Sequence, residues 1–287
     1  MILVTGATGG LGHQTIDFLL TTTPAAKIAA LVRDVNKATD LVKQGVDVRQ
    51  ADYIDYSALV KAFQGVEKVL LVSAVAFTDR VRQHRNVIDA AVQAGVKHLF
   101  YTSIQRSTDF VMPEVTESDL ATEAYLKASG LVYTILKNGY YFEGLGYLIG
   151  SEVPDSEIRF PAGEGKIAFV KRTELAATTA SLLTSEGHEN QEYILSGSAA
   201  YSFHDIAREF SALAGRPIAY KSIDEAHYIA QKVAAGFPEV VANFLAQWGA
   251  AAKEGMLAGT SDTVERLLGR QPTSLREYLQ TTYFSGR

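Results

Sequence analysis

Short apolar runs alternate with amphipathic stretches up to about residue 140. The runs are too short for helices and are apolar on consecutive positions, which is typical of strands buried on both faces of a parallel sheet. Between them, apolar residues recur at helical spacing, as at Ile16, Leu19 and Leu20. The alternation predicts an α/β fold with a doubly wound parallel sheet. The expected strands cover residues 2–4, 27–33, 46–50, 68–73, 96–103 and 131–136.

A glycine-rich turn joins the first strand to the first helix and has the G-x-x-G-x-x-G pattern of a dinucleotide fingerprint. Gly6 permits the tight turn, and Gly12 lets the helix pack close to the strand. Gly9 or Gly10 lets the backbone approach a pyrophosphate, to which the helix N-terminus offers N–H groups and partial positive charge. The residues expected to contact a dinucleotide here are Gly6, Thr8, Gly9, Gly10, Leu11 and Gly12. The pattern favours a Rossmann-type fold; the alternative is a glycine turn that binds nothing.

The end of the second strand bears on which nicotinamide cofactor binds. In sheets of this type an Asp or Glu bonds the ribose 2′-hydroxyl of NAD, whereas an Arg suits the 2′-phosphate of NADP. The strand ends in Arg33, whose guanidinium can bind a phosphate, although Asp34 follows at once. We therefore favour NADPH over NADH. The alternative is that Arg33 is a solvated residue at the sheet edge.

The residues after the later strands are further candidates. Asp52 follows the third strand, where its carboxylate accepts a hydrogen bond either from the adenine amino group or within a turn. The small residues Ser73, Ala74 and Val75 follow the fourth strand and are expected to face the ribose and nicotinamide of the cofactor. Ser103 ends the fifth strand, where this fold places catalytic groups.

A long helix is expected over residues 80–91. It carries several arginines and His84, which we interpret as a solvated face rather than a binding patch. Elsewhere, His188, His204 and His227 lack the spacing of metal ligands, so no metal site is predicted.

Composition narrows the class of protein. A chain of 287 residues with 47% hydrophobic content can bury a large core. The net charge of −5 gives no electrostatic footprint for nucleic acid, and no apolar run approaches the length of a membrane span. The absence of cysteine excludes disulfides, thiolate zinc sites and cysteine nucleophiles. We expect a cytoplasmic protein that binds neither nucleic acid nor membrane.

The pattern becomes less regular after about residue 144. We expect a dinucleotide-binding domain over residues 1–143, to which a segment at about 166–198 returns. The remaining segments, about 144–165 and 199–287, are expected to form a smaller, mainly helical substrate-binding part.

Several short motifs spread over the chain belong together. They are residues 5–12, 31–33, 50–53, 101–103, 138–139 and 163–166. This combination resembles the NmrA-like, atypical short-chain dehydrogenase/reductase family, and within it the bacterial NADPH:quinone oxidoreductases and triphenylmethane reductases. The resemblance implies NADPH bound along the strand ends, with contacts from residues 6–11 of the glycine turn, Arg33, residues 73–75, and Asn138 with the aromatic residues that follow it. One departure is Lys137, where the family leads us to expect Arg.

The usual catalytic acid of short-chain dehydrogenases, a Tyr-x-x-x-Lys pair on one helix face, is missing. Tyr133 and Lys137 have the spacing but lie in an expected strand, which puts them about 13 Å apart. Tyr228 and Lys232 can be helical but follow far beyond the last strand of the sheet.

Reduction of a quinone tolerates that absence, because the protein mainly has to hold an electron-poor ring and stabilise charge on its oxygen. The candidate groups are Asn138, Tyr140, Tyr141 and Ser103. For each of them ordinary packing is the alternative.

The preferred hypothesis is an NADPH-dependent reductase that acts on quinones or similar planar aromatic compounds. One alternative is a non-enzymatic NADP(H)-binding redox sensor of the NmrA type. Another is a different dehydrogenase or epimerase on the same fold, which normally requires the missing acid–base pair. The partner is then a small molecule, and a homodimer is left open.

Overall fold

A computed structural model describes residues 1–74, 78–113 and 115–285. By internal contacts the chain divides into two compact units. Unit 1 comprises residues 1–104, 113–138 and 172–194, and unit 2 comprises residues 105–112, 139–171 and 195–287. Residues 105–112, 139–143, 166–171 and 195–198, which we had expected in the dinucleotide-binding domain, therefore group with unit 2.

Unit 1 is built around a seven-stranded sheet with the order β3-β2-β1-β4-β5-β6-β9. The strands are β1 (Ile2–Val4), β2 (Ile28–Val32), β3 (Asp47–Gln50), β4 (Lys68–Leu71), β5 (His98–Ile104), β6 (Val132–Asn138) and β9 (Gln191–Leu195). The first six pair in parallel; Leu3 of β1, for example, lies between Ala29 of β2 and Val69 of β4. This is the doubly wound Rossmann order, so the predicted fold class is confirmed. Each predicted boundary of these six strands falls within two residues of the observed one.

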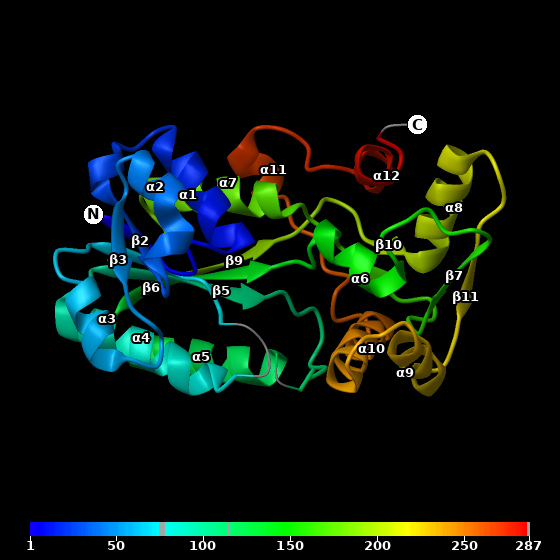
Figure 1. Ribbon diagram of the computed structural model, residues 1–287, viewed down its shortest axis with the longest axis horizontal. Helices are drawn as coiled ribbons and strands as arrows, with labels where there is room; N and C mark the ends of the chain where they lie inside the picture. Colours follow the sequence, from blue (N-terminus) through cyan, green and yellow to red (C-terminus); the bar gives the residue numbers. More distant parts are fainter. Residues whose placement is uncertain (75–77, 114, 286–287) are drawn as a thin grey trace. The chain divides into compact units, whose positions relative to one another are not determined.

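Helices cover both faces of this sheet (Figure 1). On one face lie α1 (Gly10–Leu20), α2 (Thr39–Lys43) and α7 (Arg172–Thr184). On the other lie α3 (Tyr56–Ala62), α4 (Arg80–Ala94) and α5 (Thr116–Ala128). Short 3₁₀ turns are at η1 (Ala25–Lys27) and η2 (Val35–Ala38). Every residue of β2 and β5 is buried, which explains the continuous apolar run of β2 and the apolar stretch at the centre of β5.

Local signals fix where the helices begin and end. The side chains of Asp55 and Asp79 accept hydrogen bonds from the first-turn N–H groups of α3 and α4. Helix α4 ends at Gly95, which has the left-handed conformation that glycine adopts at no steric cost. Helix α1 differs, because no side chain caps its N-terminus.

Unit 2 contains two small sheets, in which β8 pairs antiparallel with β10 and β7 pairs parallel with β11. Their strands are β7 (Glu157–Phe160), β8 (Lys166–Ile167), β10 (Tyr201–Ser202) and β11 (Ala219–Ser222). The rest is mainly helical, as predicted. The helices are η3 (Phe142–Gly144), α6 (Leu145–Ile149), α8 (Phe203–Ala214), α9 (Glu225–Ala234), α10 (Glu239–Lys253), α11 (Thr263–Leu268) and α12 (Leu275–Tyr283).

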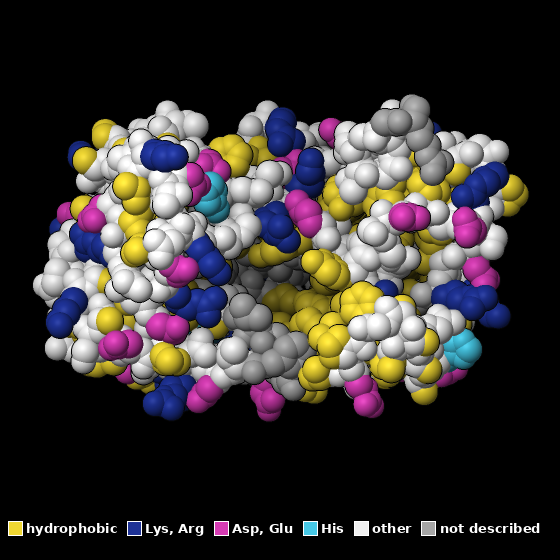
Figure 2. All heavy atoms as spheres, in the orientation of Figure 1, with side chains coloured by type: hydrophobic (Ala, Val, Ile, Leu, Met, Phe, Trp, Pro, Cys, Tyr) yellow, Lys and Arg dark blue, Asp and Glu magenta, His cyan; other side chains and the backbone are white. Residues whose placement is uncertain are grey.

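Within the described residues 1–74, 78–113 and 115–285, no helix combines the length and the hydropathy needed to span a membrane. On the face shown in Figure 2, Lys and Arg side chains are interspersed with Asp and Glu.

Candidate functional site

The glycine turn, residues 6–12, folds back on itself through backbone contacts. Gly6 has φ +58°, in the left-handed region, and the N–H of Gly9 donates to the carbonyl of Gly6 over 2.9 Å. A Cβ atom on Gly12 would lie 2.4 Å from that same carbonyl oxygen. Gly12 therefore has to be glycine for α1 to start this close to β1, as the sequence predicts.

The start of α1 offers its N–H groups to a ligand. Gly9 precedes the helix in extended conformation, no side chain caps the helix, and its first turn carries no acidic residue. Gly6, Thr8, Gly9 and Gly10 are exposed, whereas Leu11 and Gly12 are buried. An uncapped helix N-terminus with an exposed glycine backbone is a site for an anion such as a pyrophosphate.

The position of this turn in the sheet is equally informative. The strand order reverses between β1 and β4, and ligands of doubly wound sheets bind at this switch point beyond the carboxyl ends of the strands. The glycine turn leaves β1 there, and Ser73 and Ala74 leave β4. Val75, which we also expect at the cofactor, lies outside the described residues.

Sequence reasoning missed a cation beside the glycine turn. A Cβ atom on Gly10 would come within 2.9 Å of Nη1 and 3.0 Å of Cδ of Arg172, so this side chain lies against the Gly10 backbone. Arg172 is the first residue of α7, which packs along α1. No local pattern brings these two helix starts together, because they are far apart in the sequence.

At the end of β2 the two neighbouring charges are used differently. Asp34 caps η2, where its carboxylate accepts from the N–H of Asn36 over 3.0 Å. Arg33 is exposed, and within the described residues no group hydrogen bonds its guanidinium; its carbonyl accepts from Gln50 over 2.9 Å. The guanidinium of Arg33 is therefore accessible to the phosphate of a bound ligand, whereas the carboxylate of Asp34 is used to cap η2. Asp52 accepts from the N–H of Ile54 over 3.2 Å, so it does form a turn, and its contact with adenine stays a prediction.

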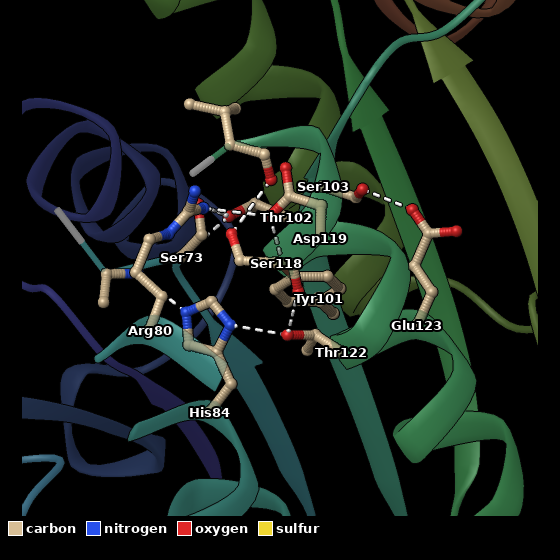
Figure 3. A network of polar contacts seen from close by, with 12 residues as sticks. Ser73, Arg80, His84, Tyr101, Thr102, Ser103, Ser118, Asp119, Thr122 and Glu123 are labelled. Carbon is tan, nitrogen blue, oxygen red and sulfur yellow. Dashed lines mark hydrogen bonds and ion pairs between the residues drawn. The ribbon is translucent and has the colours of Figure 1, made fainter. Parts of the chain in front are cut away.

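The chain leaving β4 is held by side chains from two other elements (Figure 3). The N–H of Ser73 donates to Oγ1 of Thr102, and the N–H of Ala74 donates to Nε2 of His84, each over 2.9 Å. His84 is fully buried, so the prediction of a solvated face is wrong for this residue. Arg82 and Arg85 on the same helix are exposed, as expected.

The prediction of a solvated face is also wrong for Arg80 of α4, which is only 6% exposed. Its guanidinium pairs with Asp119 of α5 over 2.9 Å, and the hydroxyl of Tyr101 donates to the same carboxylate over 2.6 Å. Burial and the charge of Asp119 raise the pKa of Tyr101 well above its usual value, so this hydroxyl stays protonated. A buried carboxylate of this kind is costly unless it is paired, and Arg80 supplies the pairing.

Ser103 is buried at the end of β5, and its hydroxyl donates to the carboxylate of Glu123. Asp119 and Glu123 are four residues apart on α5, so they share one helix face. Tyr101 and Ser103, two residues apart on β5, contact them in turn (Figure 3). This face of α5 therefore presents two carboxylates to the strand.

Asn138 and Tyr140 lie close together in the sequence, but the division between the two units falls between residues 138 and 139. Asn138 is the last residue of β6 and of unit 1, is 4% exposed and pairs in register with Ile104. Gly139, the first residue of unit 2, leaves little room for a side chain, since its Cβ would lie 3.0 Å from the carbonyl oxygen of Ala168. Tyr140 follows directly.

Tyr140 belongs to an aromatic cluster in unit 2. The cluster comprises Tyr140, Phe142, Phe169, Trp248 and Tyr278. The ring of Tyr140 lies edge-on to Trp248 at 4.6 Å between centroids. Phe142 stacks between Phe169 and Tyr278 at 5.1 and 4.6 Å and is fully buried, so it is a core residue. Figure 2 shows apolar side chains gathered over α6 and α10 of this unit.

The hydroxyl of Tyr140 is a polar group of this cluster with no hydrogen bond to another described residue. Burial raises its pKa. A Cβ atom on Gly144 would lie 2.8 Å from this hydroxyl, so Gly144 leaves room for it. The next residue, Tyr141, forms a parallel bridge with Val170 through its backbone.

The two Tyr-x-x-x-Lys matches lie where the sequence predicts. Tyr133 and Lys137 are in strand β6, and the Lys137 ammonium pairs with Glu192 over 2.5 Å. Tyr228 and Lys232 are on α9, where the hydroxyl of Tyr228 donates to the carbonyl of Leu148 over 2.9 Å. Among the residues the structure describes, no group of three His, Cys, Asp or Glu side chains is arranged to hold a metal ion.

A doubly wound sheet with a glycine turn at its switch point defines a dinucleotide-binding protein of the Rossmann type. Comparison with known families identifies it further. Residues 1–279 match the model of the NmrA-like family, and the chain belongs to that family. The family predicted from the sequence motifs is thereby confirmed.

Three relatives illustrate the similarity. The NADPH-dependent quinone oxidoreductase of Escherichia coli, solved in complex with NADPH, is 39% identical, with a TM-score of 0.92 over 98% of this chain and 99% of that one. The triphenylmethane reductase of Citrobacter sp., solved with NADP(H), is 35% identical, with a TM-score of 0.92 over 98% and 100%. The NAD(P)H azoreductase of Xenophilus azovorans is 32% identical over 97% of this chain and 96% of its own length.

Proposed function

We propose that this chain is a reductase that transfers hydride from NADPH to quinones or similar planar, electron-poor compounds. The observation that carries the proposal is the uncapped, exposed glycine turn at the switch point of the sheet. The oxidoreductase class and the NADPH cofactor predicted from the sequence agree with all three relatives described above. The acceptor itself is inferred from their names and from the aromatic cluster.

The residues of unit 1 fit the cofactor. The glycine turn and the N-terminus of α1 would hold the pyrophosphate, with the cation of Arg172 beside Gly10 adding positive charge. Arg33 would bind the 2′-phosphate, because its guanidinium is exposed while Asp34 is engaged in a cap. Residues 73–74 and Asn138 would contact the ribose and nicotinamide end.

Bound NADPH supplies the hydride in this proposal. Reduction of a quinone to a hydroquinone also consumes one proton, which must reach the oxygen where negative charge develops. We assign this donation to the hydroxyl of Tyr140. Like any tyrosine hydroxyl it carries a proton at neutral pH, and among the described residues no other group hydrogen bonds it. Ser103 is less suited as the proton donor, because its hydroxyl already donates a hydrogen bond to the carboxylate of Glu123.

A redox sensor that binds NADP(H) without turnover is the second candidate. It is favoured by the absence of the usual acid–base pair: Tyr133 and Lys137 lie in a strand, and Lys137 is paired with Glu192. Both functions need the same cofactor site and differ only in turnover.

A steady-state assay separates the two. NADPH oxidation is followed at increasing concentrations of a small benzoquinone, a naphthoquinone and a triphenylmethane dye. The reductase proposal predicts saturable turnover with at least one acceptor and a slower reaction with NADH. Tight NADPH binding without turnover on any acceptor would instead support the sensor.

A further inference from the structure

His84 lies buried beside the chain that leaves β4, and the direction of its hydrogen bonds can be worked out from its neighbours (Figure 3). The N–H of Ala74 can only donate, so Nε2 of His84 must be the acceptor and carries no proton. The proton is then on Nδ1 and is donated to Oγ1 of Thr122 over 2.9 Å. The Thr122 hydroxyl in turn donates to the carbonyl of Ser118 over 2.8 Å. The proton of the imidazole therefore has one place, on Nδ1.

The surroundings keep the ring in this neutral form. Burial lowers the pKa of His84 to about 3, and the nearby charge of Arg80 acts in the same direction. The ring of Tyr101 packs edge-on against the imidazole at 5.4 Å between centroids. A neutral imidazole whose second nitrogen is fixed by another group is a rigid acceptor.

The neighbouring N–H group is held in the same way. Thr102 of β5 accepts from the N–H of Ser73, so two consecutive backbone groups are tied to two different elements. Residues 73–74 therefore leave β4 along one fixed path, at the switch point where the strand order reverses. Backbone N–H groups that bond inward in this way cannot reorient toward solvent.

We propose that His84 is a positioning residue: by accepting from Ala74, with its tautomer set by Thr122, it fixes the loop of residues 73–74 against the cofactor. The proposal rests on the proposed function, which assigns this loop to the ribose and nicotinamide. It predicts that His84 affects NADPH binding without touching NADPH.

The chain offers a matched control in His98. It is also a buried histidine, 6% exposed, and its Nε2 bonds Oγ1 of Thr134 over 2.8 Å. The Thr134 hydroxyl donates to a backbone carbonyl, that of His188, over 2.6 Å. His98 begins β5 and pairs with Lys68 at the start of β4, whereas residues 73–74 follow the opposite, carboxyl end of β4. Its loss should therefore affect stability but not the cofactor.

The test compares His84→Leu, His84→Gln and His98→Leu by titration of NADPH, with thermal unfolding measured alongside. We expect His84→Leu to raise the Kd for NADPH about tenfold, as loss of one fixed hydrogen bond allows. His84→Gln, whose amide oxygen can accept from Ala74, should stay within about twofold of the wild type, as should His98→Leu. Equal Kd values for His84→Leu and His98→Leu would overturn the proposal.

Two further measurements keep the outcome clear. If His84→Leu does not fold, Thr122→Val keeps the ring but removes the partner of Nδ1, and we expect the Kd to rise about threefold; an unchanged Kd would count against the proposal. Nitrogen NMR of labelled histidine should show an unprotonated Nε2 in His84, and a protonated Nε2 would refute the assignment. Wild-type protein that binds no NADPH would refute the proposed function instead, while the NMR result still reports on the ring.

Discussion

The glycine turn of unit 1 and the aromatic cluster of unit 2 serve the proposed reaction through different parts of the polypeptide. In the glycine turn the backbone is the functional group, and Gly6, Gly9 and Gly12 matter because a side chain there would block it or strain it. In the aromatic cluster the side chains are the functional groups, and Tyr140 contacts Trp248, more than one hundred residues later in the sequence. The first region is local in sequence, and the second exists only after folding.

This difference predicts how each region responds to substitution. The glycine turn should be intolerant of any added atom, because its contacts are between backbone groups that cannot move aside. The aromatic cluster should tolerate changes that keep its rings and lose activity when one hydroxyl is removed.

The largest effect is expected for Gly12→Ala. The new Cβ would lie 2.4 Å from the carbonyl oxygen of Gly6, so α1 must shift away from the turn. We expect kcat/KM for NADPH to fall by more than about 100-fold, because the shifted turn would no longer hold the pyrophosphate in its position. Gly65→Ala is the control, since it has positive φ but nothing within 4 Å of its Cβ. It should lose stability and keep its kinetics; equal kinetic losses would contradict the account.

Tyr140→Phe tests the aromatic cluster. It keeps the ring against Trp248 and removes only the hydroxyl. We expect kcat with a quinone to fall about 100-fold, as for the loss of a general acid, with the KM for NADPH unchanged. Tyr278→Phe removes a hydroxyl from the same cluster and should leave kcat unaltered. A Tyr140→Phe enzyme with normal kcat would transfer the donor role to water or another residue.

Arg33→Ala tests the choice of cofactor at the edge of unit 1. We expect the KM for NADPH to rise about tenfold, because a charge-assisted contact to the 2′-phosphate is lost. The KM for NADH should hardly change. Lys37→Ala, a nearby exposed cation, is the control. Equal increases in KM for NADPH and NADH would show that Arg33 does not bind the 2′-phosphate.

The smallest expected effect is a pH dependence of stability. Burial lowers the pKa of His84 to about 3 and that of His98 to about 4, from an ordinary value of 6.5. Below pH 6.5 these two histidines therefore bind more protons in the unfolded chain than in the folded chain, so their contribution to stability falls as the pH is lowered toward those values. The Tm should decrease between pH 7 and pH 5, and less steeply in His84→Leu. An identical slope in the variant would contradict the buried, neutral state of His84.

Features that depend on neighbouring residues could be predicted from the sequence. The sheet was predictable because apolar runs of strand length report burial on both faces, and the glycine turn because its spacing reflects backbone sterics. Arg80 and His84 were misjudged as solvated because they are polar. Their positions did carry a signal, since they share the helix face of Val87, Ile88 and Ala91, the buried face of α4.

Other parts of the site left no such signal. Arg172 reaches Gly10 only because α7 packs along α1, and the contact depends on the packing of two helices distant in sequence. The carboxylate of Glu123 meets Ser103 only once α5 lies on β5. The space around the Tyr140 hydroxyl depends on Gly144, because a side chain at Gly144 would collide with it. This contact cannot be inferred from the sequence.

Calorimetric titration of the wild-type protein shows whether the glycine turn and Arg33 together bind NADPH. We expect one NADPH to bind per chain, more tightly than NADH. Absence of binding heat for both coenzymes, over a range of temperatures, would contradict it.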